Sequence, residues 1–167
     1  MEKLKFNFKT IFLNIVCVLL ISSCSGQKDN VIDKKMTIIQ DSKYVKYVTG
    51  KNFNLWEPSD IDLKKVDEIL IKAIDENQFY FYRTKKLSEI KNSYRQYVCY
   101  IDEKGEKIIF INSMCELFTD YDKNNNPIIF DWRNEMIDVS DGGECYWNIK
   151  VNLSTNEYYE LKINGNS

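Results

Sequence analysis

The sequence contains no histidine. This absence excludes the Ser-His-Asp and Cys-His catalytic constellations and every zinc site with a histidine ligand, and it removes the commonest general base. The chain also has no block of basic residues, and its formal net charge is −2, which argues against a nucleic-acid partner. We therefore expect a protein that is not an enzyme, needs no cofactor and does not bind nucleic acid.

A long apolar run is also missing. The apolar run near the N-terminus covers only residues 11–21, whereas a helix that crosses a bilayer needs about 20 residues. Three lysines precede this run, and it closes with Ile21-Ser22-Ser23-Cys24. A basic stretch, a short apolar stretch and small residues in this order are typical of a secretory signal peptide. The last four residues resemble a lipobox, so we expect a signal peptide over residues 1–23 and lipid attachment at Cys24. An ordinary signal peptide that is cut elsewhere is the alternative.

The residues after Cys24 are polar. Residues 25–30, Ser-Gly-Gln-Lys-Asp-Asn, resemble the short Lys- and Asp-containing export signal of surface lipoproteins of Bacteroidota. We expect the lipidated cysteine and a polar tether over residues 24–41, followed by a single domain over residues 42–167. Because each buried methylene group contributes about 0.8 kcal/mol, several acyl chains hold such a protein on a membrane. The expected location is the outer membrane, with the domain exposed at the cell surface.

Two segments in the first half of the domain have readable patterns. Residues 44–49 alternate in a way that predicts a first strand, which Gly50 ends. Ser59 is a good helix N-cap, and apolar residues recur after it at helical spacing up to about Asn77. We expect one amphipathic helix over residues 59–77.

The remaining strands are expected to form hairpins. Residues 94–101 and 107–112 flank Asp102-Glu103-Lys104-Gly105 and predict a central hairpin, because both of their faces are apolar. Three further strands, over residues 136–139, 144–153 and 158–163, predict a C-terminal meander.

The alternation of residues 144–153 fixes the registers that we expect in this meander. Val139 should pair with Cys145 across a loop at residues 141–143, and Leu153 should pair with Tyr159 across a loop at residues 155–157. We expect left-handed residues in these loops at Gly143 and at Asn156 or its neighbour.

These patterns predict an α+β domain: one amphipathic helix on an antiparallel sheet of about five or six strands, with cystatin-like packing as one arrangement of this kind. Four stretches of the chain resemble small outer-envelope lipoproteins of Bacteroidota whose function is unassigned. They are Trp56-Glu57-Pro58-Ser59, Tyr94-Arg95-Gln96-Tyr97 with Tyr100-Ile101, Asp141-Gly142-Gly143 with Cys145-Tyr146-Trp147, and Leu161-Lys162-Ile163-Asn164-Gly165. The resemblance implies a compact secreted domain and provides no catalytic residue.

Three cysteines follow Cys24, at positions 99, 115 and 145. An oxidising envelope permits one disulfide among them. Cys115 lies about six residues beyond the expected partner of Cys99, roughly 20 Å away, which is too far for a bond between these two. A bond between Cys99 and Cys145 stays open, and the alternative is that the cysteines are small buried apolar residues.

Two groups of acidic residues are candidates for chemistry. Asp120, Asp122 and Asn124, with Asp131 eleven residues after Asp120, follow the spacing of a calcium loop, but the glycine and the final glutamate of that motif are missing. A plain turn is the alternative. Four carboxylates near one expected hairpin end raise the hypothesis of a glycoside hydrolase; they are Glu135, Asp138, Asp141 and Glu144.

Aromatic residues provide the remaining hint of function. We expect Trp132, Tyr146 and Tyr158 on the outer face of the meander, where they would bind a glycan or a protein; the alternative is that a second layer covers them. The leading hypothesis is a non-enzymatic binding or accessory lipoprotein of the outer envelope. The alternative is an immunity or inhibitor lipoprotein that neutralises a toxin or hydrolase.

Overall fold

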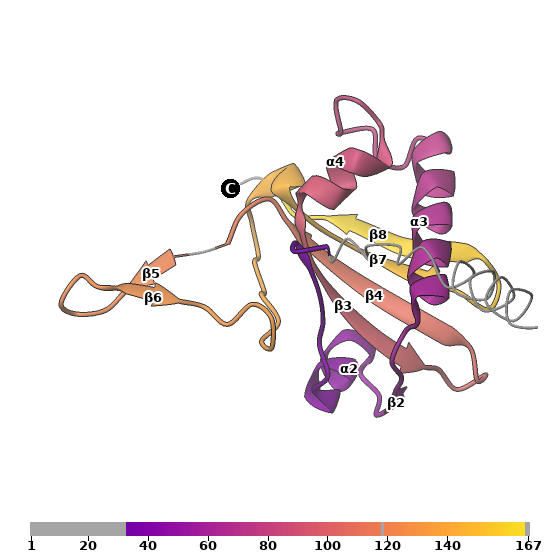
Figure 1. Ribbon diagram of the computed structural model, residues 1–167, viewed down its shortest axis with the longest axis horizontal. Coiled ribbons are helices and arrows are strands. Elements are labelled where there is room, and N and C mark those ends of the chain that lie inside the picture. Colours follow the sequence, from indigo (N-terminus) through magenta and orange to yellow (C-terminus); the bar gives the residue numbers. More distant parts are fainter. Residues whose placement is uncertain (1–32, 118, 166–167) are drawn as a thin grey trace, which may run out of the picture. The chain divides into compact units, whose positions relative to one another are not determined.

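The computed structural model describes residues 33–117 and 119–165. The expected signal peptide, Cys24 and most of the expected tether lie outside these residues. The described residues form one α+β unit, in which helices pack on a mixed sheet (Figure 1). Within this part of the chain, no helix is both long enough and apolar enough to cross a membrane.

Six strands make the main sheet, in the order β1-β3-β4-β7-β8, with β2 paired to β3. Their bounds are β1 Met36–Ile38, β2 Asn54–Leu55, β3 Tyr94–Ile101, β4 Lys107–Met114, β7 Tyr146–Asn152 and β8 Glu157–Ile163. All pairs are antiparallel except β1 with β3. A separate hairpin consists of β5 (Thr119–Tyr121) and β6 (Pro127–Ile129). The helices are α2 (Ser42–Thr49), α3 (Asp60–Asp75), α4 (Leu87–Asn92) and the 3-10 turn η1 (Gly143–Cys145).

Helix α3 confirms the expected amphipathic helix. Ser59 is its N-cap, and Asp62 completes a capping box in which each side chain accepts a hydrogen bond from the backbone of the other residue. The apolar stripe of α3, which includes Val66 and Leu70, is buried against one face of the sheet. We call this side the first face; Trp147 and Ile149 of β7 belong to it.

The central hairpin is also confirmed. Cys99 of β3 pairs with Ile109 of β4, and both strands lie in the middle of the sheet. Their other side, here called the second face, holds a smaller core of Ile39, Val45, Val98, Tyr100 and Ile108 under α2. The central position of β3 and β4 explains why both of their faces are apolar.

The expected first strand at residues 44–49 is wrong, because this stretch is helix α2. Asp41 caps the helix by accepting the backbone N–H of Lys43, and Gly50 ends it in the left-handed region at φ 71°. The domain also starts earlier than residue 42, since β1 lies in the sheet and Ile39 is buried. Part of the expected tether is therefore sheet.

The C-terminal meander is only partly confirmed. Residues 136–139 form no strand; β4 occupies their expected place, with Met114 opposite Tyr146. Strands β7 and β8 do pair, but Val151 lies opposite Tyr158, whereas the expected register puts Leu161 there, so the register differs by three residues. A bulge at Glu160, which has φ 54°, then changes the register of these two strands by one residue between Lys150 and Asn148. The left-handed backbone expected at Asn156 is present, with φ 60°.

Candidate functional site

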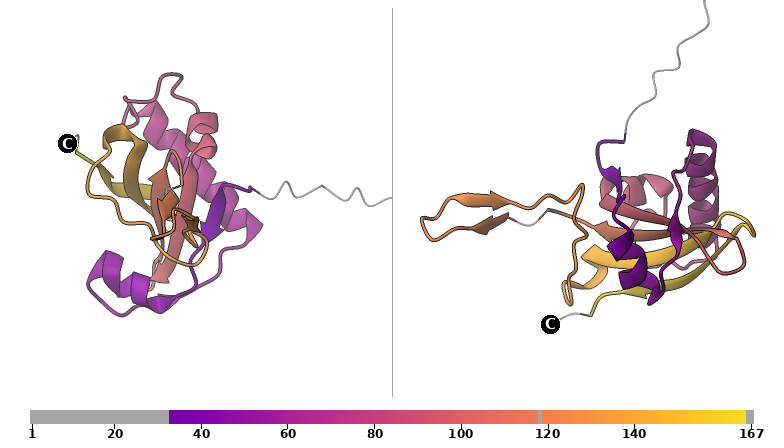
Figure 2. Two further views of the ribbon diagram at one scale, coloured as in Figure 1. Left: turned by 90° about the vertical axis from the view of Figure 1, so that its left-hand side faces the viewer. Right: turned by 90° about the horizontal axis from the view of Figure 1, so that it is seen from below.

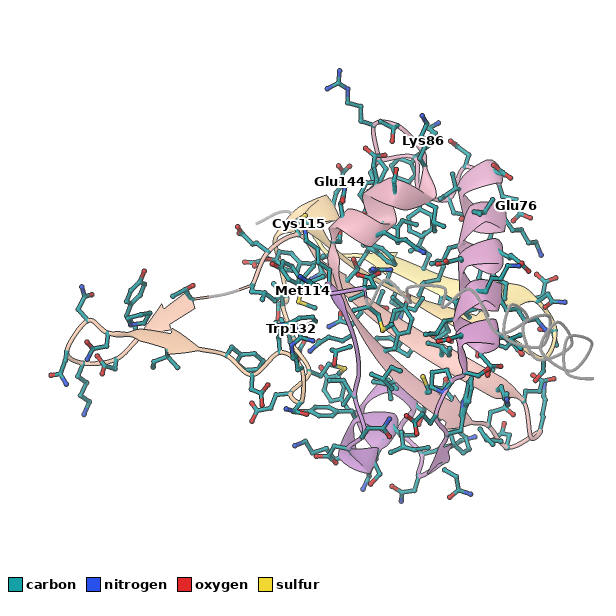
Figure 3. All side chains as sticks on the ribbon, viewed as in Figure 1. Glu76, Lys86, Met114, Cys115, Trp132 and Glu144 are labelled. Carbon is teal, nitrogen blue, oxygen red and sulfur yellow. A yellow bond between two sulfur atoms is a disulfide. The ribbon has the colours of Figure 1, made fainter. Side chains whose placement is uncertain are left out.

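The most unusual segment of the domain is the connection between β4 and β7. Met114 ends β4 and pairs with Tyr146, the first residue of β7. The chain therefore leaves the sheet after Met114 and re-enters it at a neighbouring position. We call the connecting residues 115–145 the excursion. A disulfide between Cys115 and Cys145 closes its root, where the two Cα atoms are 5.1 Å apart. Figure 3 shows Cys115 next to Met114 at this junction.

This disulfide was not anticipated, and the suggested bond between Cys99 and Cys145 is wrong. Cys99 is a free, buried cysteine on the first face, as its alternative interpretation holds, and burial raises the pKa of its thiol to about 12. The expected meander placed residues 136–139 beside Cys145. The pairing of β4 with β7 brings Cys115 there instead.

The first half of the excursion is an arm, defined here as residues 119–130. It contains the β5–β6 hairpin, whose strands pair only with each other, and it extends away from the main sheet (Figures 1 and 2). Asp122 builds the tip of the arm: one carboxylate oxygen accepts the backbone N–H groups of Asn124 and Asn126. Three large apolar side chains of the arm are exposed, Tyr121 (57%), Ile128 (47%) and Phe130 (38%).

The second half of the excursion is a strap, defined here as residues 131–141, which returns across the second face. The buried amide of Gln96 on β3 holds it. The Nε2 group donates to the carbonyl oxygens of Trp132 (2.5 Å) and Glu135 (2.7 Å), and Oε1 accepts the backbone N–H of Ile137 (2.9 Å). One side chain thus satisfies three backbone groups of a segment that has no regular structure.

Two asparagines extend this attachment along the strap. Asn112 of β4 donates through Nδ2 to the carbonyl of Ile137 at 2.7 Å. Asn164, just after β8, donates through Nδ2 to the carbonyls of Val139 and Asp141. Gly142 then brings the chain against the ring of Tyr146; a Cβ atom there would lie 2.5 Å from ring carbons, and φ is +93°. A side chain at this position would therefore displace the ring.

A cleft of about 90 Å³ opens where the strap meets the sheet. Its lining consists of Asn112, Met114, Ile137, Asp138, Val139, Tyr146, Asn148 and Asn164. Asp138 is exposed at the strap and accepts a hydrogen bond from the hydroxyl of Tyr47 on α2. This hydrogen bond raises the pKa of the Tyr47 hydroxyl.

The three aromatic side chains of the expected recognition surface do not share one exposed face. Trp132 and Tyr146 do come together, but they are buried at 8% exposure, where Trp132 and Ile137 of the strap pack against Met114 and Tyr146 of the sheet. Tyr158 lies on the first face, where its hydroxyl donates to Glu76 beyond the end of α3, and burial raises its pKa to about 12. The alternative interpretation is correct for Trp132 and Tyr146, because the strap, to which Trp132 itself belongs, forms a second layer on this face and both rings are buried between it and the sheet.

The acidic candidates whose side chains are described do not assemble into a site, and the side chain of Asp120 lies outside this set. Asp122 belongs to the turn of the arm, and Asp131 accepts a hydrogen bond from the amide of Asn134. Among the residues whose side chains are described, no three histidine, cysteine, aspartate or glutamate side chains form a metal-binding group. Of the four carboxylates near the expected hairpin end, only Asp138 lines the cleft.

Sequence reasoning missed the polar residues of this cleft, because they become neighbours only through strand pairing and not through their spacing along the chain. Asn112 and Asn148 pair across β4 and β7, yet each is an ordinary polar residue within its own strand. No family model, no curated protein and no solved structure matches this chain.

Proposed function

We propose that the protein is a non-enzymatic binding protein of the outer envelope, held there by lipid at Cys24, and that it recognises a partner protein through the arm. The observation that carries this proposal is the exposed apolar surface of the arm. Ile128 belongs to β6 and Phe130 follows that strand directly, so the two side chains lie near each other along the arm. Both are exposed although the domain has buried cores on both faces of its sheet.

The structure of the arm suggests that a bound partner protein would stabilise it. A two-stranded hairpin is only marginally stable in water by itself. The Cys115–Cys145 disulfide restrains the root of the arm, but the β5 and β6 strands pair only with each other. Exposed apolar patches on soluble proteins commonly mark interaction sites, and each Å² of apolar surface that a partner covers contributes about 25 cal/mol. A projecting hairpin fits an apolar groove on the surface of another protein.

The proposed location at the outer membrane and the proposed non-enzymatic role are both supported by the sequence alone. The lipobox-like residues that end at Cys24 support a lipid anchor on the outer membrane. A chain without histidine has no access to the commonest general base. A small acidic excess also supports a partner that is a protein rather than a nucleic acid.

The second candidate function is an immunity or inhibitor lipoprotein. A disulfide-rooted hairpin that projects from a folded domain has the shape needed to enter the cleft of a toxin or hydrolase. The two functions differ in what the partner is and in what binding does to its activity.

The proposal is tested by cross-linking and affinity capture of the full-length protein from membranes of its own cells. The test variant carries Ile128→Ser with Phe130→Ser. The matched control is Ile61→Ser, because Ile61 is an isoleucine of α3 that is 81% exposed and lies outside the arm. Both variants should retain the native melting temperature, since exposed side chains contribute little to stability.

We expect the native protein and the Ile61→Ser variant to capture the same partner and the arm variant to lose it. Equal capture by all three proteins would overturn the role of the arm. If the captured partner is a toxin or hydrolase whose activity the native protein blocks, the inhibitor function replaces the general binding function.

A further inference from the structure

A row of polar side chains crosses the second face of the sheet. The strand registers place Gln96 of β3 opposite Asn112 of β4, Asn112 opposite Asn148 of β7, and Asn148 opposite Lys162 of β8. Cross-strand partners share a face, so three amides and one ammonium group lie side by side. The strap covers Gln96, while Asn112 and Asn148 line the cleft.

The hydrogen bonds already made fix how two of the cleft amides point. Nδ2 of Asn112 donates to the carbonyl of Ile137, and Nδ2 of Asn164 donates to the carbonyls of Val139 and Asp141. Carbonyl oxygens only accept hydrogen bonds, so neither amide can be reversed. The Oδ1 atoms of Asn112 and Asn164 accept no hydrogen bond from a described residue.

The remaining polar groups of the cleft add further acceptors. Asp138 is exposed, and the hydroxyl of Tyr47 occupies only its Oδ2 atom. The half-buried amide of Asn148 makes no hydrogen bond with any described residue, so it offers both an acceptor and two donors. The cleft therefore provides more acceptors than donors, and a ligand must donate several hydrogen bonds to match it.

Charge narrows the class of ligand. The carboxylate of Asp138 lines the cleft and disfavours an anion. Lys162 is exposed on the same face, next to Asn148, and makes no ion pair with a described residue, so its ammonium group disfavours a cation. A purely apolar ligand would leave the acceptors without partners, which is costly. A neutral ligand with several hydroxyl groups satisfies all three conditions.

We infer that this cleft is a second binding site, and that it takes one residue of a neutral saccharide. Hydroxyl groups donate to the Oδ1 atoms of Asn112 and Asn164 and accept from the amide of Asn148. A cleft of about 90 Å³ has room for several water molecules, since one water needs roughly 10–15 Å³, and a sugar ring replaces such a group of waters. The site is independent of the arm.

The test is saturation-transfer difference NMR on the full-length protein with three free sugars: glucose, galactose and N-acetylglucosamine. The test variant is Asn148→Ala, which removes an amide that bonds to no described residue. The matched control is Asn124→Ala, an exposed asparagine at the tip of the arm. Melting temperatures of both variants show whether the fold is retained.

We expect saturation transfer to at least one sugar with the native protein and with Asn124→Ala. In Asn148→Ala the affinity should fall about fivefold or more, the loss expected for one hydrogen bond. No transfer to any sugar at millimolar concentration would overturn the inference, and so would equal affinity in Asn148→Ala. Methylammonium and N-methylacetamide are the competing probes, and binding of either in place of the sugars would also overturn it.

Discussion

Cys115 and Cys145 lie one position beyond the last residue pair of β4 and β7, Met114 with Tyr146. The disulfide therefore continues the ladder of these two strands at the point where hydrogen bonding ends. It closes a sequence separation of 30 residues, and it ties both ends of the excursion to the sheet. An oxidising compartment outside the cytoplasm is where such a bond persists.

Replacing both cysteines, as Cys115→Ser with Cys145→Ser, should lower the free energy of unfolding by about 3–4 kcal/mol, because a loop of this length gains much freedom in the unfolded chain. Urea denaturation measures the change. A reducing agent should lower the stability of the native protein to that of the double variant and leave the variant unchanged. An effect of the reductant on the variant would show that another thiol reaction is responsible.

Gln96→Leu should destabilise the protein by about 2–4 kcal/mol, because it leaves buried backbone groups of the strap without hydrogen bonds. The affected groups are the carbonyls of Trp132 and Glu135 and the N–H of Ile137. Urea denaturation followed by tryptophan fluorescence measures the change in stability. Gln78→Leu, at an exposed glutamine after α3, is the control and should cost little. Equal effects of the two variants would contradict the attachment of the strap.

Asp62→Asn should destabilise the protein at neutral pH by about 1 kcal/mol through loss of the capping box. The hydrogen bond with the hydroxyl of Ser59 is the main reason that the pKa of Asp62 lies below its usual value. A lowered folded pKa means that the carboxylate stabilises the fold fully above its unfolded pKa and loses this effect as pH falls through the folded value.

The stability difference between the native protein and Asp62→Asn should therefore shrink as pH falls below about 4. Urea denaturation at a series of pH values measures it. Asp75→Asn, at the last residue of α3, is the control, because a negative charge near a helix C-terminus gives no stabilisation. A difference that stays constant down to the lowest pH would rule out the ionised cap as its cause.

Cys24→Ala should move the protein from the membrane fraction to the soluble fraction, because it removes the proposed site of lipid attachment. Fractionation of cells with detection of the protein measures the change. Cys17→Ala, a cysteine within the apolar run of the expected signal peptide, is the matched control and should stay with the membrane. Membrane association of Cys24→Ala would contradict the lipid anchor.

Local patterns predicted the parts of the fold that depend on neighbouring residues. The N-cap and apolar stripe of α3, the β3–β4 hairpin and the alternation of β7 are all visible within short windows of sequence. The prediction of a strand at residues 44–49 was wrong because this short stretch fits both the helical and the strand periodicity. Val45 and Val48 suit one face of a helix, while the alternating order of residues suits a strand. The helix is favoured over the strand because Asp41 caps its N-terminus and Gly50 ends it in the left-handed conformation.

The candidate site was harder to predict because it depends on one long-range pairing. Strand β4 pairs with β7 across 31 intervening residues, 115–145, and no local pattern specifies that choice. The exposure of Trp132 and Tyr146 depends in turn on the strap, which exists only because of this pairing. The acceptors of the cleft come from Asn112, Asn148 and Asn164, three amides that become neighbours only once the sheet is assembled.

The bulge at Glu160 also has a consequence for the outer edge of the sheet. Strand β8 is an outer strand of the sheet, so one side of its backbone is open to pairing with another chain. The left-handed residue at position 160 interrupts the regular ladder in the middle of that edge. A second copy of the chain would therefore find no continuous strand to extend, which disfavours edge-to-edge pairing between two sheets.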